Sequence, residues 1–260
     1  MIGYSRVGLK KYNSQMNRVE GSACRKVDLH VHTPKSMCYS DQSVTPEQIV
    51  DTALAADLEV IAITDHNTAE AVDDIRQVAR EKGLFVFPGV ELTTGGGHVI
   101  ALFELDTSVE KLEGFLNHVG VARQGWGDAA IMTGDGIEEV FQKIDERKGI
   151  AIAAHIERWP SGFLETNEPR RVKMRIHSSK YLSALEISVL QNKSLWNAGL
   201  MRGYPKKYAC IQGSDAHALN EIGRRPVYIQ MERIGLEALR LAFNDYETRI
   251  VFPNEFAPSK

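Results

Sequence analysis

The chain contains 260 residues with a formal net charge of −3, 43% hydrophobic residues and 25% charged residues. These proportions are ordinary for a globular protein and exclude a disordered or fibrous chain. The length suits one or two domains, or a single α/β barrel. No apolar run approaches the roughly 18 residues of a membrane helix, so we expect no membrane contact. The small negative charge gives no overall attraction for nucleic acid.

Cysteine usage and the start of the chain bear on where the protein works. Residues 1–24 contain no apolar segment of the signal-peptide kind, so we do not expect export. The three cysteines, Cys24, Cys38 and Cys210, form no Cys-x-x-Cys pair, and their odd number argues against a disulfide framework. We therefore expect a cytoplasmic protein.

From Lys26 onward, short apolar runs alternate with helical stretches. The expected strands are residues 27–32, 60–64, 84–90, 98–103, 150–155, 184–189, 208–212 and 227–230. The expected helices are residues 46–56, 69–82, 109–119, 137–148 and 193–202. This alternation predicts βα units and a parallel sheet, and seven or eight such units predict a closed barrel.

The remaining segments divide the chain further. Residues 1–24 are polar and basic without periodicity, which predicts an N-terminal extension ahead of one barrel domain over residues 25–260. Residues 157–179 are rich in charge, proline and glycine, and are expected to form a long loop over one barrel mouth. A last amphipathic helix is expected over residues 236–243 and a short final strand over 249–252.

Six of the eight histidines fall at ends of expected strands. In a parallel barrel, the loops at the carboxyl ends of the strands meet at one mouth, where catalytic groups collect. His30 and His32 of Asp-Leu-His-Val-His are two residues apart on a strand, so their side chains point to the same side. The alternative is a pair of hydrogen-bonded histidines inside the barrel.

Five further motifs repeat this placement. They are Thr-Asp-His at 64–66, Gly-Val-Glu at 89–91, a glycine run before His98, Ala-Ala-His at 153–155 and Ser-Asp-Ala-His at 214–217. Each motif alone is also explained by a polar strand cap or a hydrogen-bonded loop residue. Together they supply imidazole and carboxylate groups, the ligand types of Zn, Mn and Fe. There are more candidates than one ion takes, so we expect two or three ions.

The order of these motifs resembles the PHP (polymerase and histidinol phosphatase) family over about residues 25–230. Residues 25–34, 214–226 and 239–249 are similar to PHP modules that lie N-terminal to SMC-like ATPase regions. The resemblance implies a distorted (β/α)7 barrel with a two- or three-metal centre at the carboxyl ends of the strands, which hydrolyses phosphoesters. The chain contains no G-x-x-x-x-G-K-[ST] motif, so an ATPase would be a separate partner.

The resemblance also implies which residues bind metal. A first ion would be held by His30, His32, Glu91 and Asp215; Glu91 would bridge to a second, completed by His98 and His155; and a third would be held by Asp41, His66 and His217. Asp41 follows His32 by nine residues, whereas the corresponding family ligand usually follows by five or six. The loop between them must therefore bulge if Asp41 is a ligand.

This metal centre predicts the chemistry of the reaction. Two cations that share a carboxylate can share a water, whose pKa falls toward about 7. Glu91 and Asp215 are therefore the expected catalytic carboxylates, and Asp65 is included with them as a residue that orients a ligand. Substrate phosphate is expected to contact Arg158, Lys35 and Arg224, the alternative for each being an ordinary surface charge.

Two features favour a nucleotide or single-stranded nucleic acid as the substrate. Tyr39, Trp126 and Trp159 are expected near the mouth, where they could stack on a base, although packing within loops is the alternative. Five cations between residues 158 and 175 would attract a polyanion locally. We therefore expect hydrolysis at a nucleotide or a nucleic-acid end.

Three other functions compete with this prediction. A small-molecule phosphatase of the histidinol-phosphate type would use the same chemistry. An amidohydrolase-like barrel also begins with His-x-His, but it usually needs a metal-bridging lysine, and no lysine occupies a suitable strand end. A metal-stabilised regulatory module that partners an ATPase would be expected to have lost ligands, whereas all nine are present.

Overall fold

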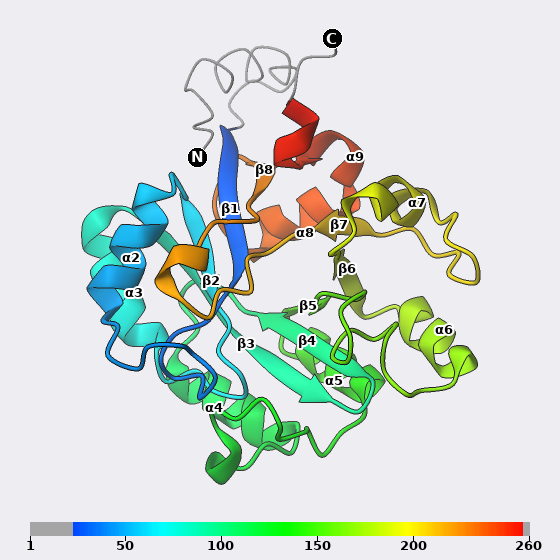
Figure 1. Ribbon diagram of the computed structural model, residues 1–260, viewed down its shortest axis with the longest axis horizontal. Coiled ribbons are helices and arrows are strands. Elements are labelled where there is room, and N and C mark those ends of the chain that lie inside the picture. Colours follow the sequence, from blue (N-terminus) through cyan, green and yellow to red (C-terminus); the bar gives the residue numbers. More distant parts are fainter. Residues whose placement is uncertain (1–22, 257–260) are drawn as a thin grey trace.

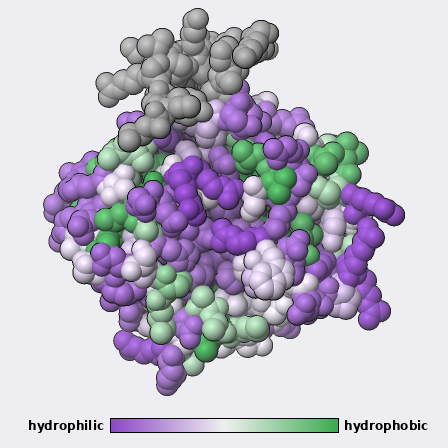
Figure 2. All heavy atoms as spheres, in the orientation of Figure 1, coloured by the Kyte–Doolittle hydropathy of each residue, from purple (hydrophilic) through white to green (hydrophobic). Residues whose placement is uncertain are grey.

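The computed structural model describes residues 23–256 of the chain. Within this part, nine strands form one sheet in the order β7-β6-β5-β4-β3-β2-β1-β8-β9, and the helices lie around it (Figure 1). In the same view, hydrophilic residues gather over the middle of the face and apolar patches lie nearer its rim (Figure 2). Among these residues, no helix combines the length and apolar character needed to cross a membrane.

The strands are β1 (Ala23–Val31), β2 (Val60–Ile63), β3 (Phe85–Thr94), β4 (Gly97–Leu102), β5 (Ile150–Ala153), β6 (Leu182–Glu186), β7 (Ala209–Ile211), β8 (Val227–Met231) and β9 (Ile250–Val251). The helices are α2 (Pro46–Ala55), α3 (Val72–Lys82), α4 (Val109–His118), α5 (Ile137–Glu146), α6 (Arg170–Ser178), α7 (Lys193–Ala198), α8 (Leu236–Asn244) and α9 (Tyr246–Arg249).

The sheet curves into a nearly closed barrel, which confirms the expected fold. Beyond β7, Val31 forms an isolated bridge with Ala216, and the His32 backbone N–H donates to the Ala216 carbonyl at 3.1 Å. These contacts join the end of β1 to the segment after β7. They bring the first and last strand ends of the barrel to the same mouth.

The expectation of a parallel sheet is wrong for several strand pairs. The pairs β3–β4, β4–β5, β1–β8 and β8–β9 are antiparallel, and the pairs β1–β2, β2–β3, β5–β6 and β6–β7 are parallel. Only Gly95 and Gly96 connect β3 to β4. Two residues close a hairpin, whereas a parallel crossover needs a dozen or more.

Two expected boundaries also differ. The expected loop over residues 157–179 contains helix α6, whose buried Ile176 anchors it to the core. Strand β1 begins at Ala23, so Ala23 and Cys24 of the expected extension pair with β8. The rest of the extension lies outside the described residues, and the division into residues 1–24 and 25–260 stays a prediction.

Helix starts follow the capping signals in the sequence. Thr45 accepts a hydrogen bond from the Gln48 backbone while the Gln48 side chain accepts one from Thr45, and Pro46 occupies the first turn of α2. Ser108 caps α4 by accepting a hydrogen bond from the Lys111 backbone N–H. The helices bury their apolar faces against strands such as β2, in which all four residues are buried. This core fixes the strand ends that carry the polar groups of the mouth.

Candidate metal centre

Histidine and carboxylate side chains from six segments converge at one mouth of the barrel. His30 and His32 end β1, while the other segments follow β2, β5 and β7 or belong to the β3–β4 hairpin. Because β4 runs antiparallel to β3, its first residues lie beside the last residues of β3, and His98 pairs with Thr93. Glu91 lies inside β3, three residues before its end, rather than at the expected strand terminus.

Glu91 occupies the middle of this cluster and its carboxylate is fully buried. Its Oε1 lies 3.0 Å from His98 Nδ1 and 2.9 Å from His155 Nε2. Its Oε2 faces three further imidazoles: His66 Nδ1 at 3.0 Å, His30 Nε2 at 3.3 Å and His32 Nε2 at 3.3 Å. The two oxygens of one carboxylate therefore face two different groups of nitrogens, as a carboxylate that bridges two ions does.

Four donor atoms are spaced closely enough to bind one metal ion between them. His30 Nε2 lies 3.1 Å from His32 Nε2 and 3.2 Å from Asp215 Oδ1, and His32 Nε2 lies 3.0 Å from Asp215 Oδ1. Glu91 Oε2 is 3.3 Å from both ring nitrogens. The centre of a tetrahedron with such edges is about 2 Å from each corner, which is the usual bond length from Zn²⁺ to nitrogen or oxygen.

Two atoms of the cluster lack hydrogen-bond partners. Glu91 Oε2 and His66 Nδ1 are buried and lie 3.0 Å apart, yet neither has a hydrogen bond of suitable geometry. Orphaned buried polar atoms are rare unless an ion or a water satisfies them. His66 also groups with Glu91 and His98, and separately with His32 and His217, with all ligand atoms of a group within 4.8 Å. The donor set fits divalent metal ions.

Glu186 is a functional residue that the sequence reasoning missed. Its Oε2 lies 2.9 Å from His30 Nδ1 and accepts a hydrogen bond from the His155 backbone N–H at 2.9 Å. A carboxylate on the far nitrogen of a metal-binding imidazole fixes the ring orientation and tautomer. A Cβ on Gly213 would lie 2.3 Å from Glu186 Oε1, so glycine is required there. The available signal was a lone carboxylate at the end of the apolar strand β6.

Asp65 points away from the ligand atoms and supports the first loop. Its carboxylate accepts hydrogen bonds from the Thr33 backbone, the Thr33 hydroxyl and the Ser36 hydroxyl, each at 2.7 Å. Ser36 Oγ lies 3.0 Å from His32 Nδ1 and accepts from the His66 backbone N–H at 3.0 Å. Asp65 therefore orients the His32 imidazole and the His66 backbone through Ser36.

Two residues of the cluster have left-handed backbone conformations. His155 has φ 28° and Asp215 has φ 48°. Such angles are uncommon for residues other than glycine, and the strain they store is typical of functional sites. The β5 and β7 chains are thus bent at the positions where their side chains enter the mouth.

The charges of the cluster shift its pKa values strongly. Burial alone would raise the pKa of Glu91, but His30, His66 and His98 lower it well below its usual range. Burial opposes protonation of His32, yet the nearby carboxylates of Asp215 and Glu91 raise its pKa to about 9. Burial lowers the pKa of His66 to about 3. Ionised Glu91 and neutral His66 are the forms that bind metal.

Three other predicted site residues, Asp41, Lys35 and Arg224, contact residues outside this cluster. Asp41 is exposed, and its Oδ1 accepts hydrogen bonds from the Ser43 backbone and hydroxyl, so the structure does not bring it to the cluster. Lys35 Nζ lies 3.7 Å from Glu70 at the surface. Arg224 bonds to the Ser214 carbonyl and to Glu221.

Arg158 is the predicted phosphate-binding residue that does reach the cluster. Its guanidinium forms an ion pair with Asp215, and its side chain is 38% exposed. It therefore lies between a candidate metal ligand and solvent.

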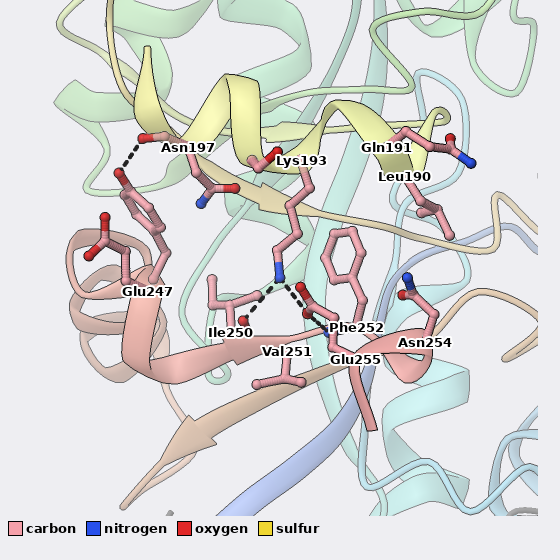
Figure 3. Close-up of a pocket in the computed structure, with 12 residues that line it drawn as sticks. Leu190, Gln191, Lys193, Asn197, Glu247, Ile250, Val251, Phe252, Asn254 and Glu255 are labelled. Atoms are coloured by element: carbon pink, nitrogen blue, oxygen red, sulfur yellow. Dashed lines mark hydrogen bonds and ion pairs between the residues drawn. The ribbon is translucent and has the colours of Figure 1, made fainter. Parts of the chain in front are cut away.

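A cavity of about 520 Å³ lies elsewhere, between α7 and the C-terminal segment (Figure 3). Lys193 Nζ reaches across it to the Ile250 carbonyl at 3.3 Å and to Glu255 at 2.6 Å, and lies 4.2 Å from the centre of the Phe252 ring. These contacts use the lysine to tie the end of the chain to α7. Among the residues that line this cavity, no candidate metal ligands cluster.

Comparison with known proteins identifies a matching domain family and several relatives. The model of the PHP domain family matches residues 28–164. An uncharacterized protein of Methanocaldococcus jannaschii is 31% identical over 137 residues, which cover 50% of this chain and 67% of that protein. A 5′-3′ exoribonuclease of Haemophilus influenzae is 29% identical over 119 residues, which cover 44% of this chain and 40% of the enzyme. The chain thus matches less than half of that enzyme's length.

Solved structures share the fold at low sequence identity. The lesion-specific endonuclease Q from Pyrococcus furiosus superposes with a TM-score of 0.66 at 15% identity, covering 86% of this chain and 56% of the endonuclease. A complex of endonuclease Q with a 27-mer duplex, whose abasic lesion lies at the active site, gives a TM-score of 0.64 at 15% identity, covering 85% and 56%. These likenesses concern the fold.

Proposed function

The chain belongs to the PHP domain family, and from that premise we propose that it is a metal-dependent phosphoesterase that acts on nucleic acid. The observation that carries the proposal is the single buried carboxylate of Glu91, whose two oxygens face five imidazoles. A structural role does not require so many titratable groups around one buried charge. Sites of this composition hold divalent ions.

We propose two or three ions, of Mn, Fe or Zn. His30, His32, Glu91 and Asp215 would hold one, and Glu91, His98 and His155 would hold another. His66 and His217 would contribute to a third site, to which Asp41 belongs only if its exposed loop folds inward. When bound, such ions supply Lewis acidity toward a phosphoryl oxygen and lower the pKa of water.

The chain's own residues provide orientation and charge. Glu186 and Asp65 hold imidazoles in place through their outer nitrogens or through Ser36. Arg158, which contacts Asp215 and is partly exposed, is placed to bind the non-bridging oxygens of a phosphoester. Cys38 is a poor nucleophile, because partial burial and the nearby Glu91 and Asp215 raise its pKa to about 11.

The relatives support nucleic acid as the substrate class. Proteins named 5′-3′ exoribonuclease in Haemophilus influenzae and Salmonella typhimurium share 29% and 33% identity with parts of this chain. The endonuclease Q complex shows a related fold with a nucleic-acid duplex at its active site. These observations favour nucleic acid over a small phosphate of the histidinol type, and a partner ATPase stays a prediction.

A substrate panel tests the proposal. Protein reconstituted with Mn²⁺ is assayed on p-nitrophenyl phosphate, its diester, mononucleotides, histidinol phosphate and short single-stranded oligonucleotides. We expect hydrolysis of oligonucleotides that stops when a chelator is added. Turnover confined to histidinol phosphate would reject the substrate class, and no turnover of any phosphoester with metal bound would reject the reaction.

A further inference from the structure

A second cavity adjoins the metal centre. It has a volume of about 670 Å³, within the usual range of about 300–1,000 Å³ for small-molecule sites. Thr93 and His98 belong to its wall. His98 Nε2 lies 3.3 Å from Thr93 Oγ1, and His98 Nδ1 lies 3.0 Å from Glu91. A group bound in this cavity would therefore touch a side chain of the metal centre. We call it the Trp159 cavity, after the aromatic residue in its wall.

Of the three aromatic residues expected near the mouth, Trp159 has the most exposed side chain. Tyr39 is buried, and Trp126 is half-buried under the guanidinium of Arg123, which lies 5.2 Å from its ring. Trp159 is 76% exposed, and no ring contact or hydrogen bond of its side chain occurs among residues 23–256. Its ring face is therefore available to stack on a bound group.

The turn that carries Trp159 is held on both sides. The Arg158 backbone N–H donates to the His155 carbonyl at 2.8 Å, and the Gly162 N–H donates to the Arg158 carbonyl at 2.7 Å. The Ser161 carbonyl accepts from the His98 backbone N–H at 2.8 Å. The neighbours of Trp159 thus contact two candidate metal ligands, and these contacts anchor the backbone that carries the indole beside the centre.

The charges in the cavity favour a base over a phosphate. Glu165 and Glu168 belong to the wall, and among residues 23–256 neither forms an ion pair. Carboxylates repel a phosphate, but they accept hydrogen bonds from the amino and imino groups of nucleobases. Met132, which is 59% exposed, adds polarizable surface to the same wall.

We propose that the Trp159 cavity binds the nucleobase adjacent to the cleaved phosphoester, with Trp159 as the stacking surface and Glu165 and Glu168 as hydrogen-bond acceptors. This inference rests on the function proposed above. It makes the cavity the part of the site that distinguishes a nucleotide from other phosphoesters. The phosphate chain then lies on the Arg158 side of the centre, away from the two carboxylates.

The test compares an oligonucleotide with its fully abasic counterpart of equal length. Loss of base–aromatic stacking weakens binding by about 5- to 150-fold. We expect Trp159→Ala to raise KM for the oligonucleotide by that factor and to leave KM for the abasic chain within about twofold. Trp159→Phe should restore most of the difference. Leu200→Ala removes another exposed apolar side chain, 70% exposed at the end of α7, and should change neither KM.

The outcomes separate this inference from the proposed function. Equal KM changes on both substrates, or no change on either, would overturn the base site while leaving phosphoester hydrolysis intact. If no phosphoester is cleaved, tryptophan fluorescence decides the question. A nucleoside phosphonate should quench the wild-type signal but not that of Trp159→Phe, and methylphosphonate should quench neither. No quenching of the wild type by the nucleoside phosphonate would overturn the proposal.

Discussion

Carboxylates on the outer side of the candidate metal centre fix the orientation and the tautomer of its imidazoles. Glu186 touches His30 on the nitrogen that faces away from Glu91. Burial would raise the pKa of Glu186, but His30 lowers it, so this carboxylate is ionised at neutral pH. The ionised group keeps the proton of His30 on Nδ1 and leaves Nε2 free to bind metal.

Replacement of Glu186 by glutamine should therefore weaken metal binding without removing any ligand. Such outer partners are typically worth about 10- to 100-fold in metal affinity or activity. We expect Glu186→Gln to raise the Kd for Mn²⁺ within that range, measured by calorimetric titration of the metal-free protein. Glu138→Gln is the matched control, because Arg175 at the surface is the only ion-pair partner of Glu138 in the described part of the chain. Equal affinities in the two variants would contradict this role.

His177 is a second residue with a predicted effect, because its buried imidazole makes the stability of the fold depend on pH. It is fully buried among the rings of Trp196, Tyr204 and Tyr208, and within residues 23–256 neither ring nitrogen has a hydrogen-bond partner. Burial, followed by the nearby Lys206, lowers its pKa to about 4. Between pH 6.5 and 4 the unfolded chain binds a proton that the folded chain does not, so stability falls as the pH falls.

We expect His177 to account for about 2–3 kcal/mol of the loss in unfolding free energy between pH 6.5 and 4. The measurement is urea denaturation of the wild type and of His177→Phe across this range. The variant should show the shallower pH dependence. Parallel pH profiles of the two proteins would show that His177 does not titrate as described.

The candidate metal ligands other than Asp41 were predictable from the sequence, whereas Glu186 was not. His30, His32 and Asp215 occur in recurring motifs at strand ends, and strand alternation alone places the first two on one side. The carboxylate of Glu186 acts through contacts with residues 156 positions before it and 31 positions before it. No local pattern encodes such a contact.

Among the elements, the β3–β4 hairpin has the largest effect on the site. It places Glu91 and His98 side by side and packs against the segment that carries Trp159. Gly97 has φ 120°, and a Cβ there would lie 2.8 Å from the Phe163 backbone nitrogen. The hairpin can approach that segment only because this position is glycine.

We expect Gly97→Ala to lower the free energy of unfolding by about 1–3 kcal/mol and to reduce activity by displacing His98. Gly95→Ala is the matched control, since a Cβ at Gly95 meets nothing within 4 Å. Chemical denaturation and phosphoesterase assays of both variants provide the measurement. A Gly97 variant as stable and as active as the Gly95 variant would show that the close approach is unimportant.

For the secondary-structure elements, the sequence predicted which segments are helices or strands better than it predicted how the strands pair. The expected strand after the glycine run was correct as β4, but its direction depends on the two-residue connection, which excludes a crossover. Helix α6 was expected as a loop, because its composition is charged along most of its length. Only Ile176 and His177 on α6 are buried, so tertiary contacts rather than periodicity specify this helix.

For the molecule as a whole, the contact that closes the barrel lies between two candidate metal ligands. The bridge between Val31 and Ala216 lies next to His32 on one side and Asp215 on the other. An ion held by these two ligands would join the first and last strand ends of the barrel. Ions that bind only the folded state stabilise it by mass action. We therefore expect bound ions to be both structural and catalytic.

The most direct test of this account is a titration of metal-free protein with Mn²⁺, in which bound metal and oligonucleotide hydrolysis are measured on the same samples. We predict that more than one ion binds per chain, that hydrolysis appears only as these ions bind, and that Glu91→Ala loses both metal and turnover. Full hydrolysis by Glu91→Ala, or no hydrolysis by the wild type with several ions bound, would contradict the account.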